Sequence, residues 1–236
     1  MGFIVFFKKL SNYRSIIYAI YFNFHYLPLK QAWKLPIMLY KPKLYSCKGK
    51  VVIMPKDGRI WHGMIKLGYN LVSVYPNSGV MWENKGGTII FRGKCTIGND
   101  TYLSFGENTV VDFGDDFRNR AGAKIISYRG IKFGQCTSMG WGVLCMDTNF
   151  HSLYDIVTKE FKASSGFIEI GDYNWFGAQC KIMHSTITPE RCIWGMGTIV
   201  TRGCVKKSYC LMGGSPVRIL SENVMRFIGE EQDKKY

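Results

Sequence analysis

The sequence repeats itself every six residues over much of its second half. From position 170 to 205 it divides without a gap into IGDYNW, FGAQCK, IMHSTI, TPERCI, WGMGTI and VTRGCV. The first column of these hexads is mostly bulky: Ile170, Phe176, Ile182, Thr188, Trp194 and Val200. The fifth column holds only small side chains: Asn174, Cys180, Thr186, Cys192, Thr198 and Cys204. Neither an α-helix nor a β-hairpin has this period, so neither explains this half of the chain.

A bulky column and a small column predict a narrow coil. The bulky residue fills the interior of the coil, and the small residue fits the tight space near each corner. Three hexads give one triangular coil of about 18 residues, and each coil buries its core by stacking on its neighbours. The sequence therefore predicts an all-β solenoid.

The same pattern appears earlier in the chain and locates an insertion. Hexads begin at Phe133, Met139 and Cys145, and apolar-Gly-polar triplets begin at Ile97, Phe113, Phe133 and Ile170. Successive triplets are 16, 20 and 37 residues apart, so the last interval holds about 19 residues more than one coil. We expect these residues to leave the coil as an excursion at about 151–169, within a solenoid domain at 49–220.

Both ends of the solenoid need caps, and helices are predicted for them. In the N-terminal arm, 1–48, one helical face is apolar, Ser11 suits the N-cap and Pro28 lies beyond the end. The apolar residues of this face are Tyr13, Ile16, Ile17, Ile20 and Phe24. In the C-terminal segment, 221–236, Ser221 and Glu222 suit a helix start, and Val224, Phe227 and Ile228 are expected to lie against the last coil.

Positive charge is concentrated at the N-terminus. The first 50 residues hold nine lysines and arginines and no acidic residue, within a formal net charge of +14 for the chain. They are also rich in aromatics, so residues 3–45 are a candidate for peripheral contact with anionic lipid, with a helix packed on the solenoid as the alternative. Their longest apolar stretch is too short to span a bilayer, and no signal-peptide pattern is present. We expect a cytoplasmic protein, with the inner face of the membrane as a further location.

The cysteines and histidines give no sign of a metal site. Eight cysteines are scattered singly, without a CxxC pair, which favours free thiols over disulfides. Neither they nor the four histidines show the spacing of zinc ligands, so no metal is expected.

With these repeats the chain resembles the hexapeptide-repeat acyltransferases of left-handed β-helix fold, and among them those of bacterial capsule and lipopolysaccharide gene clusters. The resemblance covers most of 49–220. It is strongest in CTSMGWGVLCMDTNFHSLYD, at 136–155, and in 170–220, which ends MGGSPVRIL. It implies a left-handed parallel β-helix, a homotrimer with active sites shared between subunits, and an acetyltransferase that uses acetyl-CoA to modify a sugar hydroxyl.

The resemblance also singles out a histidine. The family segment D-x-D-x-H matches positions 147–151, where Asn149 replaces the middle carboxylate. An extended backbone would place Asp147, Asn149 and His151 on one side. Imidazole titrates near neutrality, so His151 can accept the proton of the hydroxyl as it attacks the thioester, and Asp147 can fix its tautomer. Asn149 either contacts the acceptor or caps the turn. Trp141 is a candidate for lining the acceptor site, whereas His184 fits a surface position.

Coenzyme A needs cations for its phosphates and accessible backbone beside its pantetheine arm. The late hexads allow close approach at Gly177, Ala178, Gly195 and Gly197, and offer cations at Arg202, Lys206, Lys207 and Arg218. The resemblance adds Thr198, Thr201 and the turn 214–216, with Pro216 near the adenine. A solvated basic surface is the alternative for the lysines.

The sequence leaves the acceptor open. A sugar, a nucleotide-sugar and a lipid-linked saccharide all fit, and amino-sugar N-acetyltransferase and serine acetyltransferase are variants of the same chemistry. A non-enzymatic solenoid that binds polyanions is the alternative from another class. Against it, the charge lies mostly outside the repeats and no nucleic-acid motif is present, so nucleic acid is not expected as a partner.

Overall fold

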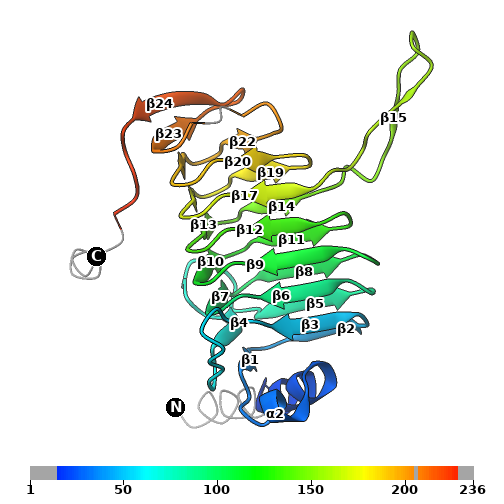
Figure 1. Ribbon diagram of the computed structural model, residues 1–236, viewed down its shortest axis with the longest axis vertical. Helices are drawn as coiled ribbons and strands as arrows, with labels where there is room; N and C mark the ends of the chain where they lie inside the picture. Colours follow the sequence, from blue (N-terminus) through cyan, green and yellow to red (C-terminus); the bar gives the residue numbers. More distant parts are fainter. Residues whose placement is uncertain (1–14, 205–206, 228–236) are drawn as a thin grey trace.

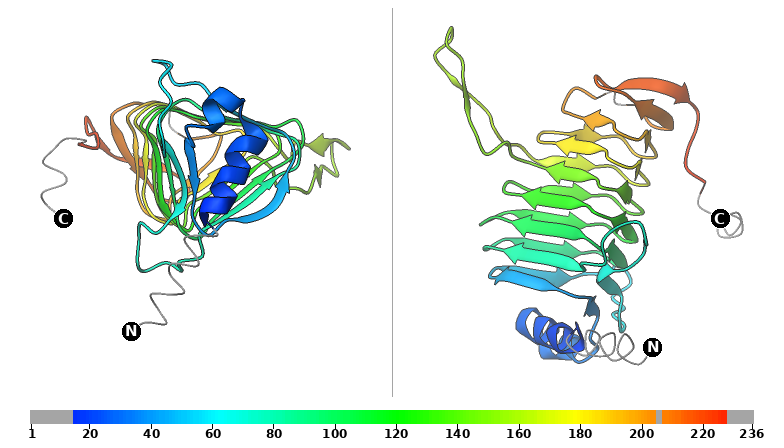
Figure 2. Two further views of the ribbon diagram at one scale, coloured as in Figure 1. Left: turned by 90° about the horizontal axis from the view of Figure 1, so that it is seen from below. Right: turned by 180° about the vertical axis from the view of Figure 1, so that it is seen from behind.

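The computed structural model describes residues 15–204 and 207–227, which form a stack of triangular coils (Figure 1; Figure 2). Sheet A consists of β1 (Ile37–Leu39), β4 (Ile65–Tyr69), β7 (Cys95–Gly98), β10 (Phe117–Ala121), β13 (Ser138–Trp141), β18 (Trp175–Phe176), β21 (Ile193–Trp194), β23 (Cys210–Gly213) and β24 (Arg218–Glu222). Sheet B consists of β2 (Lys43–Cys47), β5 (Val80–Asn84), β8 (Thr101–Phe105), β11 (Lys124–Ser127), β14 (Leu144–Met146), β19 (Lys181–Met183) and β22 (Ile199–Val200). Sheet C consists of β3 (Lys50–Ile53), β6 (Thr88–Phe91), β9 (Val110–Phe113), β12 (Ile131–Phe133), β17 (Ile168–Ile170) and β20 (Ile187–Thr188).

The chain visits the three sheets in a fixed order, A, B and C, once per coil. Neighbouring strands from successive coils pair in parallel, as β11 does with β8 and β14. The predicted all-β solenoid, a left-handed parallel β-helix, is therefore confirmed. Each coil has three corners, which we name AB, BC and CA after the sheets that meet there.

The hexad columns have the positions that their sizes predict. Every first-column residue from Ile170 to Val200 is at most 4% exposed, and these residues point inward from sheets C, A and B in turn. In the earlier coils the interior is filled by aromatic rings stacked from one coil to the next. Phe113 lies between Phe91 and Phe133, with both pairs of ring centres 5.3 Å apart.

The fifth column closes the corners. Thr198 is fully buried, and its hydroxyl donates a hydrogen bond of 2.6 Å to the carbonyl of Gly195 in the same turn. Asn174 is also fully buried and donates to the carbonyls of Gly171 and Pro189, which belong to two successive coils. A larger side chain would not fit there, and an apolar one would leave these buried carbonyls without a donor.

A helix lies across the N-terminal end of the stack (Figure 2). Its described residues are 15–26, and α2 (Leu29–Ala32) follows. Phe22 packs edge-on against Trp82, and the buried Asn23 side chain bonds the backbone N–H and carbonyl of Ile37. The predicted apolar face of this helix does not pack against the solenoid, because Ile16, Ile17, Ile20 and Phe24 are exposed. Tyr13 and Ser11 lie outside the described residues.

The N-terminal helical arm is also shorter than predicted. β1 and β2, at 37–47, already belong to sheets A and B, so the solenoid begins before residue 49. No helix among the described residues is long and apolar enough to cross a membrane.

The C-terminal helix predicted for 221–236 is not found at 221–227, and 228–236 lie outside the described residues. Instead, β24 pairs antiparallel with β23, the last parallel strand of sheet A. This pairing satisfies the edge of β23, which would otherwise present unpaired backbone groups.

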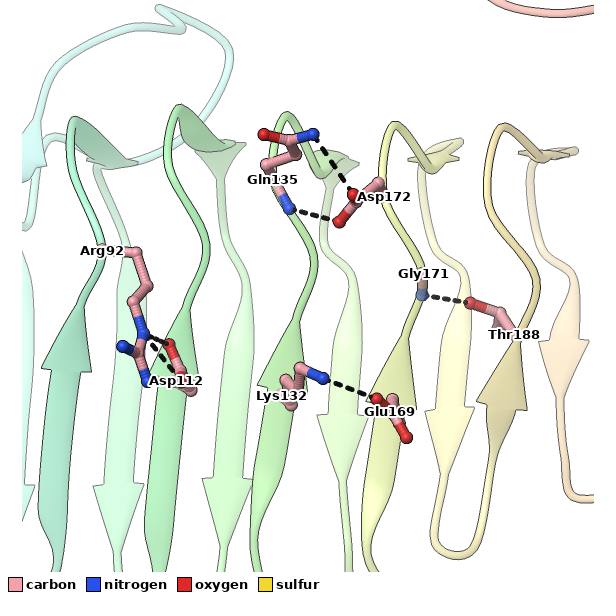
Figure 3. A network of polar contacts seen from close by, with 8 residues as sticks. All are labelled: Arg92, Asp112, Lys132, Gln135, Glu169, Gly171, Asp172 and Thr188. Carbon is pink, nitrogen blue, oxygen red and sulfur yellow. Dashed lines mark hydrogen bonds and ion pairs between the residues drawn. The ribbon is translucent and has the colours of Figure 1, made fainter. Parts of the chain in front are cut away.

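Four successive coils each carry a charged side chain on or just beyond the outer face of sheet C: Arg92, Asp112, Lys132 and Glu169 (Figure 3). Arg92 forms a bidentate pair with Asp112, with a shortest distance of 2.7 Å, and Lys132 lies 2.7 Å from Glu169. Opposite charges thus neutralise each other across successive strands of this face.

Candidate active site

The excursion leaves the coil at the BC corner. It runs from 147 to 167, between β14 and β17, and contains a hairpin of β15 (Leu153–Tyr154) and β16 (Phe161–Lys162). The hairpin projects far from the stack (Figure 1). Its tip is apolar and open to solvent, since Ile156 and Val157 are 84% and 85% exposed. A single chain gives this apolar tip nothing to pack against.

Asp147 anchors the base of the excursion and is fully buried. One carboxylate oxygen accepts hydrogen bonds from the Ser127 hydroxyl at 2.7 Å and from the backbone N–H groups of Arg129 and Gly130 at 2.9 and 2.7 Å. The other accepts from the N–H of Tyr128 at 2.8 Å. Asp147 thus closes the BC turn of the preceding coil. The expectation that it lies beside His151 is not met in the single chain, because its carboxylate is turned into that coil.

Backbone bonds fix the neck of the excursion and direct His151 outward. The N–H of Asn149 donates to the carbonyl of Ser164 at 2.7 Å, and the N–H of Phe150 donates to the Thr148 hydroxyl at 3.0 Å. Phe150 has a φ of +60° and packs edge-on against Tyr128, with ring centres 5.1 Å apart. The next residue, His151, is exposed at the BC corner. Its ring is accessible to an acceptor from solvent.

His184 lies at the same corner, which the sequence interpretation missed. The Asn149 amide nitrogen is 3.1 Å from Nε2 of His184, and Nδ1 of His184 is 3.2 Å from the Ser185 hydroxyl. The interval of 37 residues between the repeated triplets makes position 184 correspond to position 147 in the next coil. The repeat pattern therefore already indicated that His184 lies beside the start of the excursion. Asn149 therefore pairs with His184 rather than with His151.

Most of the residues predicted for coenzyme binding lie at the AB corner. Gly177, Ala178, Gly195, Gly197 and Thr198 stack there, and the β23–β24 turn with Pro216 and Arg218 continues the column. At Gly177 a Cβ atom would lie 2.8 Å from the N atom of Met196, so this glycine allows successive coils to stack. At Gly197 a Cβ atom would meet nothing within 4 Å. Gly197 thus borders open space, whereas Thr198 is buried and stabilises the corner through its hydrogen bond to the Gly195 carbonyl.

The other predicted coenzyme residues are dispersed. Thr201 and Arg202 follow β22 at the BC corner and are exposed. Lys207 forms an ion pair with Glu222 at 2.6 Å. Lys206 lies outside the described residues. The predicted set is therefore divided between two corners within one chain.

Trp141 lies at the AB corner, at the opposite edge of sheet B from His151. It is 44% exposed and faces Tyr75, with ring centres 6.5 Å apart. Tyr75 comes from the loop at 70–79, and its hydroxyl accepts from the Gln179 side chain at 3.3 Å. Sequence patterns gave no indication of Tyr75, because it is 104 positions from Gln179. Trp194, in the bulky first column, is fully buried as expected, and Trp175 is exposed on the outer face of sheet A.

A cleft of about 500 Å³ lies at the CA corner (Figure 3), on a different corner from His151. Its lining includes Lys56, Arg92 and Lys132 and the carboxylates of Asp112, Asp115 and Asp172. Since Arg92 and Lys132 are already paired, this cleft offers little net charge to a ligand.

All eight cysteines are free thiols, and six of them are buried. Burial raises the pKa of the Cys95 and Cys145 thiols well above the ordinary value, so these thiols stay protonated and unreactive. Within 15–204 and 207–227, no three His, Cys, Asp or Glu side chains are grouped as metal ligands.

Together these features define a parallel β-helix protein whose BC corner carries an exposed histidine on an anchored excursion. No protein-family model matches the sequence, and no curated protein matches it. Two solved structures are similar to it. The polySia-specific acetyltransferase NeuO matches with a TM-score of 0.53 and 19% identity, over 80% of this chain and 73% of NeuO. The polysialic acid O-acetyltransferase OatWY matches with a TM-score of 0.43 and 16% identity, over 84% of this chain and 95% of OatWY. At these identities the likeness concerns the fold alone.

Proposed function

We propose that the protein is an acetyl-CoA-dependent acetyltransferase that modifies a hydroxyl group of a saccharide, with His151 as the general base. The observation that carries the proposal is the BC corner, where an anchored excursion presents an imidazole to solvent in the D-x-N-x-H segment. The fold shared with NeuO, a polySia-specific acetyltransferase, supports the same reaction class. Acetyl-CoA enters as co-substrate, and no metal is required.

In this reaction the chain has three tasks. His151 accepts the proton of the acceptor hydroxyl as the oxygen attacks the thioester carbon, and then returns it to the leaving thiolate. Asn149 and His184 form a polar edge beside this base. Asp147 acts as a positioning residue, because its bonds to the BC turn of the preceding coil anchor the start of the histidine segment.

The coenzyme is proposed to lie along the AB corner, beside Ala178, Gly197 and Pro216, with Arg218 near a phosphate. In one chain this corner is separated from the BC corner by residues 179–183, which include β19, and five residues at about 3.3 Å each span roughly 16 Å. One chain therefore does not bring the thioester to its own base. We propose that a homotrimer does so, by placing the BC corner of one subunit beside the AB corner of the next. The exposed apolar hairpin tip supports this assembly, since such a surface normally packs against a partner.

The test is a transfer assay with acetyl-CoA and a panel of free, nucleotide-linked and lipid-linked saccharides, followed by release of free thiol. His151→Ala should lower the rate by ~10² to 10⁴ while the Kd for coenzyme A stays nearly unchanged. His62→Ala, which removes an exposed histidine elsewhere, is the matched control and should keep full activity. Near-normal transfer by His151→Ala removes this histidine from the mechanism. Amino-sugar and serine acceptors in the panel decide between the O- and N-acetylation variants.

The N-terminal cap is proposed to hold the enzyme at the inner face of an anionic membrane. Ile17, Leu29 and Trp33 are exposed on this cap, with Trp33 at 74%. Lys30 and Lys34 lie beside them, and no acidic residue occurs in the first 50 positions. Apolar side chains next to lysines are the combination that binds anionic lipid surfaces.

Sedimentation with vesicles measures this binding. The full chain should pellet with vesicles containing phosphatidylserine, and much less with phosphatidylcholine alone. Ile17→Ser combined with Trp33→Ser should abolish pelleting without unfolding the cap, because both side chains are exposed. Met196→Ser, which removes an exposed apolar residue at the AB corner, should pellet like the wild type. Equal pelleting of all variants contradicts membrane binding through the cap.

A further inference from the structure

The loop at 70–79 extends along the AB corner of coils that follow its own. It connects β4 to β5, in the second coil. Tyr75 in this loop reaches the AB corners of the fourth and fifth coils, at Gly122 after β10 and Gly142 after β13. A Cβ atom at Gly122 would overlap the Tyr75 ring, and one at Gly142 would lie 3.0 Å from the Tyr75 hydroxyl. The ring can cover this corner because both positions are glycine.

A fully buried amide holds the loop in this position. The side-chain nitrogen of Asn99 lies 3.0–3.3 Å from three carbonyl oxygens of the loop, those of Val72, Tyr75 and Pro76. The side-chain oxygen of Asn99 accepts from the N–H of Leu71 at 3.2 Å. Asn99 is 0% exposed, so these bonds replace the water that its amide has lost. The loop is therefore a fixed part of the corner.

Tyr75 and Trp141 together form a pair of rings that we call the aromatic wall. Their ring centres are 6.5 Å apart, with the planes inclined at 56°. Trp141 is 44% exposed and Tyr75 is half-buried, so both rings present apolar surface to solvent. Gln179 joins the wall to the next coil. Its backbone N–H donates to the Trp141 carbonyl at 2.7 Å, and its side chain donates to the Tyr75 hydroxyl at 3.3 Å.

The aromatic wall lies at one end of the proposed coenzyme path. Ala178 precedes Gln179, and its carbonyl accepts from the N–H of Gly197 in the following coil at 2.9 Å. The path then continues to Arg218 on β24, where a phosphate is proposed to bind. Three strand spacings of about 4.8 Å, from β23 through β21 and β18 to β13, amount to roughly 14 Å. An extended pantetheine arm covers a span of this order, so a coenzyme with its phosphates at Arg218 directs its thioester towards the wall.

The level of the base in the stack agrees with this direction. The proposed trimer places BC and AB corners side by side, which requires a threefold axis along the stack. Rotation about such an axis keeps each coil at its own level. Trp141 ends β13 and His151 follows β14, and these two strands belong to one coil. The partner's His151 is then level with the aromatic wall, which is where the thioester has to lie.

We infer that Tyr75 and Trp141 form the surface against which the acyl group of the donor ends, and that they select a short acyl group. Aromatic rings offer a methyl group a rigid apolar contact. A longer chain would have to displace the loop at 70–79, which Asn99 holds in place. This inference rests on the proposed function and adds to it the residues that select the donor.

Calorimetry of the full chain without acceptor tests the inference by comparing the Kd values of acetyl-CoA and hexanoyl-CoA. The wild type should bind hexanoyl-CoA at least tenfold more weakly. Tyr75→Ala opens the wall, so it should reduce this ratio to threefold or less and leave the Kd of acetyl-CoA within threefold. Tyr75→Phe keeps the ring and loses only the bond to Gln179, and should keep the tenfold ratio. Tyr45→Ala, which removes an exposed tyrosine from the first coil, should keep it as well.

Trp141→Ala gives an independent measurement, because this exposed ring can be removed without unfolding the corner. It should also lower the ratio to threefold or less. A wild-type ratio below tenfold overturns the inference, and so does a ratio that stays above threefold in either alanine variant. Equal weakening of both thioesters by Tyr75→Ala belongs to the second case and is the result expected of a purely structural loop.

The proposed function can fail separately. If neither thioester binds, the proposed function and the inference are both wrong. A protein that discriminates between the thioesters as expected but transfers no acetyl group contradicts only the proposed transfer, because calorimetry needs no acceptor.

Discussion

Asp147→Asn separates a structural role of this carboxylate from a catalytic one. The carboxylate is fully buried and accepts four hydrogen bonds, three at one oxygen and one at the other. In the variant the amide oxygen can keep the three, but its NH₂ group then faces the N–H of Tyr128. One charge-assisted bond is lost, about 1.5–3 kcal/mol, and the three others weaken because their acceptor becomes neutral. The removal of a buried charge offsets part of this loss. We expect the free energy of unfolding to fall by about 3 kcal/mol.

Urea unfolding followed by tryptophan fluorescence measures this change. Asp147→Ala, which leaves all four donors without an acceptor, should cost more than Asp147→Asn. Glu169→Gln is the control, because its ion pair with Lys132 is exposed and should be worth about 1 kcal/mol or less. If Asp147→Asn keeps its stability within about 0.5 kcal/mol but loses transfer activity, the structural assignment is refuted and a catalytic role is favoured.

Two further predictions concern the core and the thiols. Phe113→Ala should lower the free energy of unfolding by about 3–5 kcal/mol in the same urea assay, since it interrupts the buried ring stack. Val110 is exposed, so Val110→Ala should change this free energy by no more than about 0.5 kcal/mol. Equal effects of the two substitutions would contradict the packing described. In the native protein at neutral pH, a maleimide should modify only Cys47 and Cys136, since the other six thiols are buried, and peptide mass mapping identifies the modified residues. Modification of Cys145 at a similar rate would contradict its burial.

The hexad columns made the solenoid predictable because each column reports a position within one coil. Phe176 and Cys180 were assigned to the interior and to a corner from size alone, and both are buried. The contacts between coils were harder to predict, since they depend on the length of every insertion between them. Asn149 and His184 meet across 35 positions, and Gln179 and Tyr75 across 104. Of these two contacts, only that between Asn149 and His184 could have been predicted from the sequence, because the repeated triplets are 37 residues apart there.

The ends of the solenoid were misjudged for a different reason. Charge and aromatic content marked 1–48 as a separate arm, but β2 alternates exposed and half-buried residues in a basic segment. The exposed Lys43 belongs to the outward-facing side of this strand. Because the segment was assigned to the arm on the basis of its net charge, the alternation of period two was overlooked. At the other end, the need of β23 for a partner outweighed the weak helix signals after Ser221.

The separation of His151 from the coenzyme corner gives a test of shared active sites that needs no structure of the trimer. His151→Ala should inactivate the BC corner, and Ala178→Arg should block the coenzyme at the AB corner. Each variant alone should be inactive. When the two variants are unfolded and refolded together in equal amounts, they mix at random among the subunits of the trimers. Each interface then takes its BC corner and its AB corner independently from either variant. About one quarter of the interfaces then unite an intact BC corner with an intact AB corner, so activity should return to about one quarter of the wild-type value. If every site lies within one chain, both corners of each subunit can never be intact together, and the mixture stays inactive. Persistent inactivity of a mixture that has assembled normally by sedimentation would therefore contradict the proposed sharing of the site.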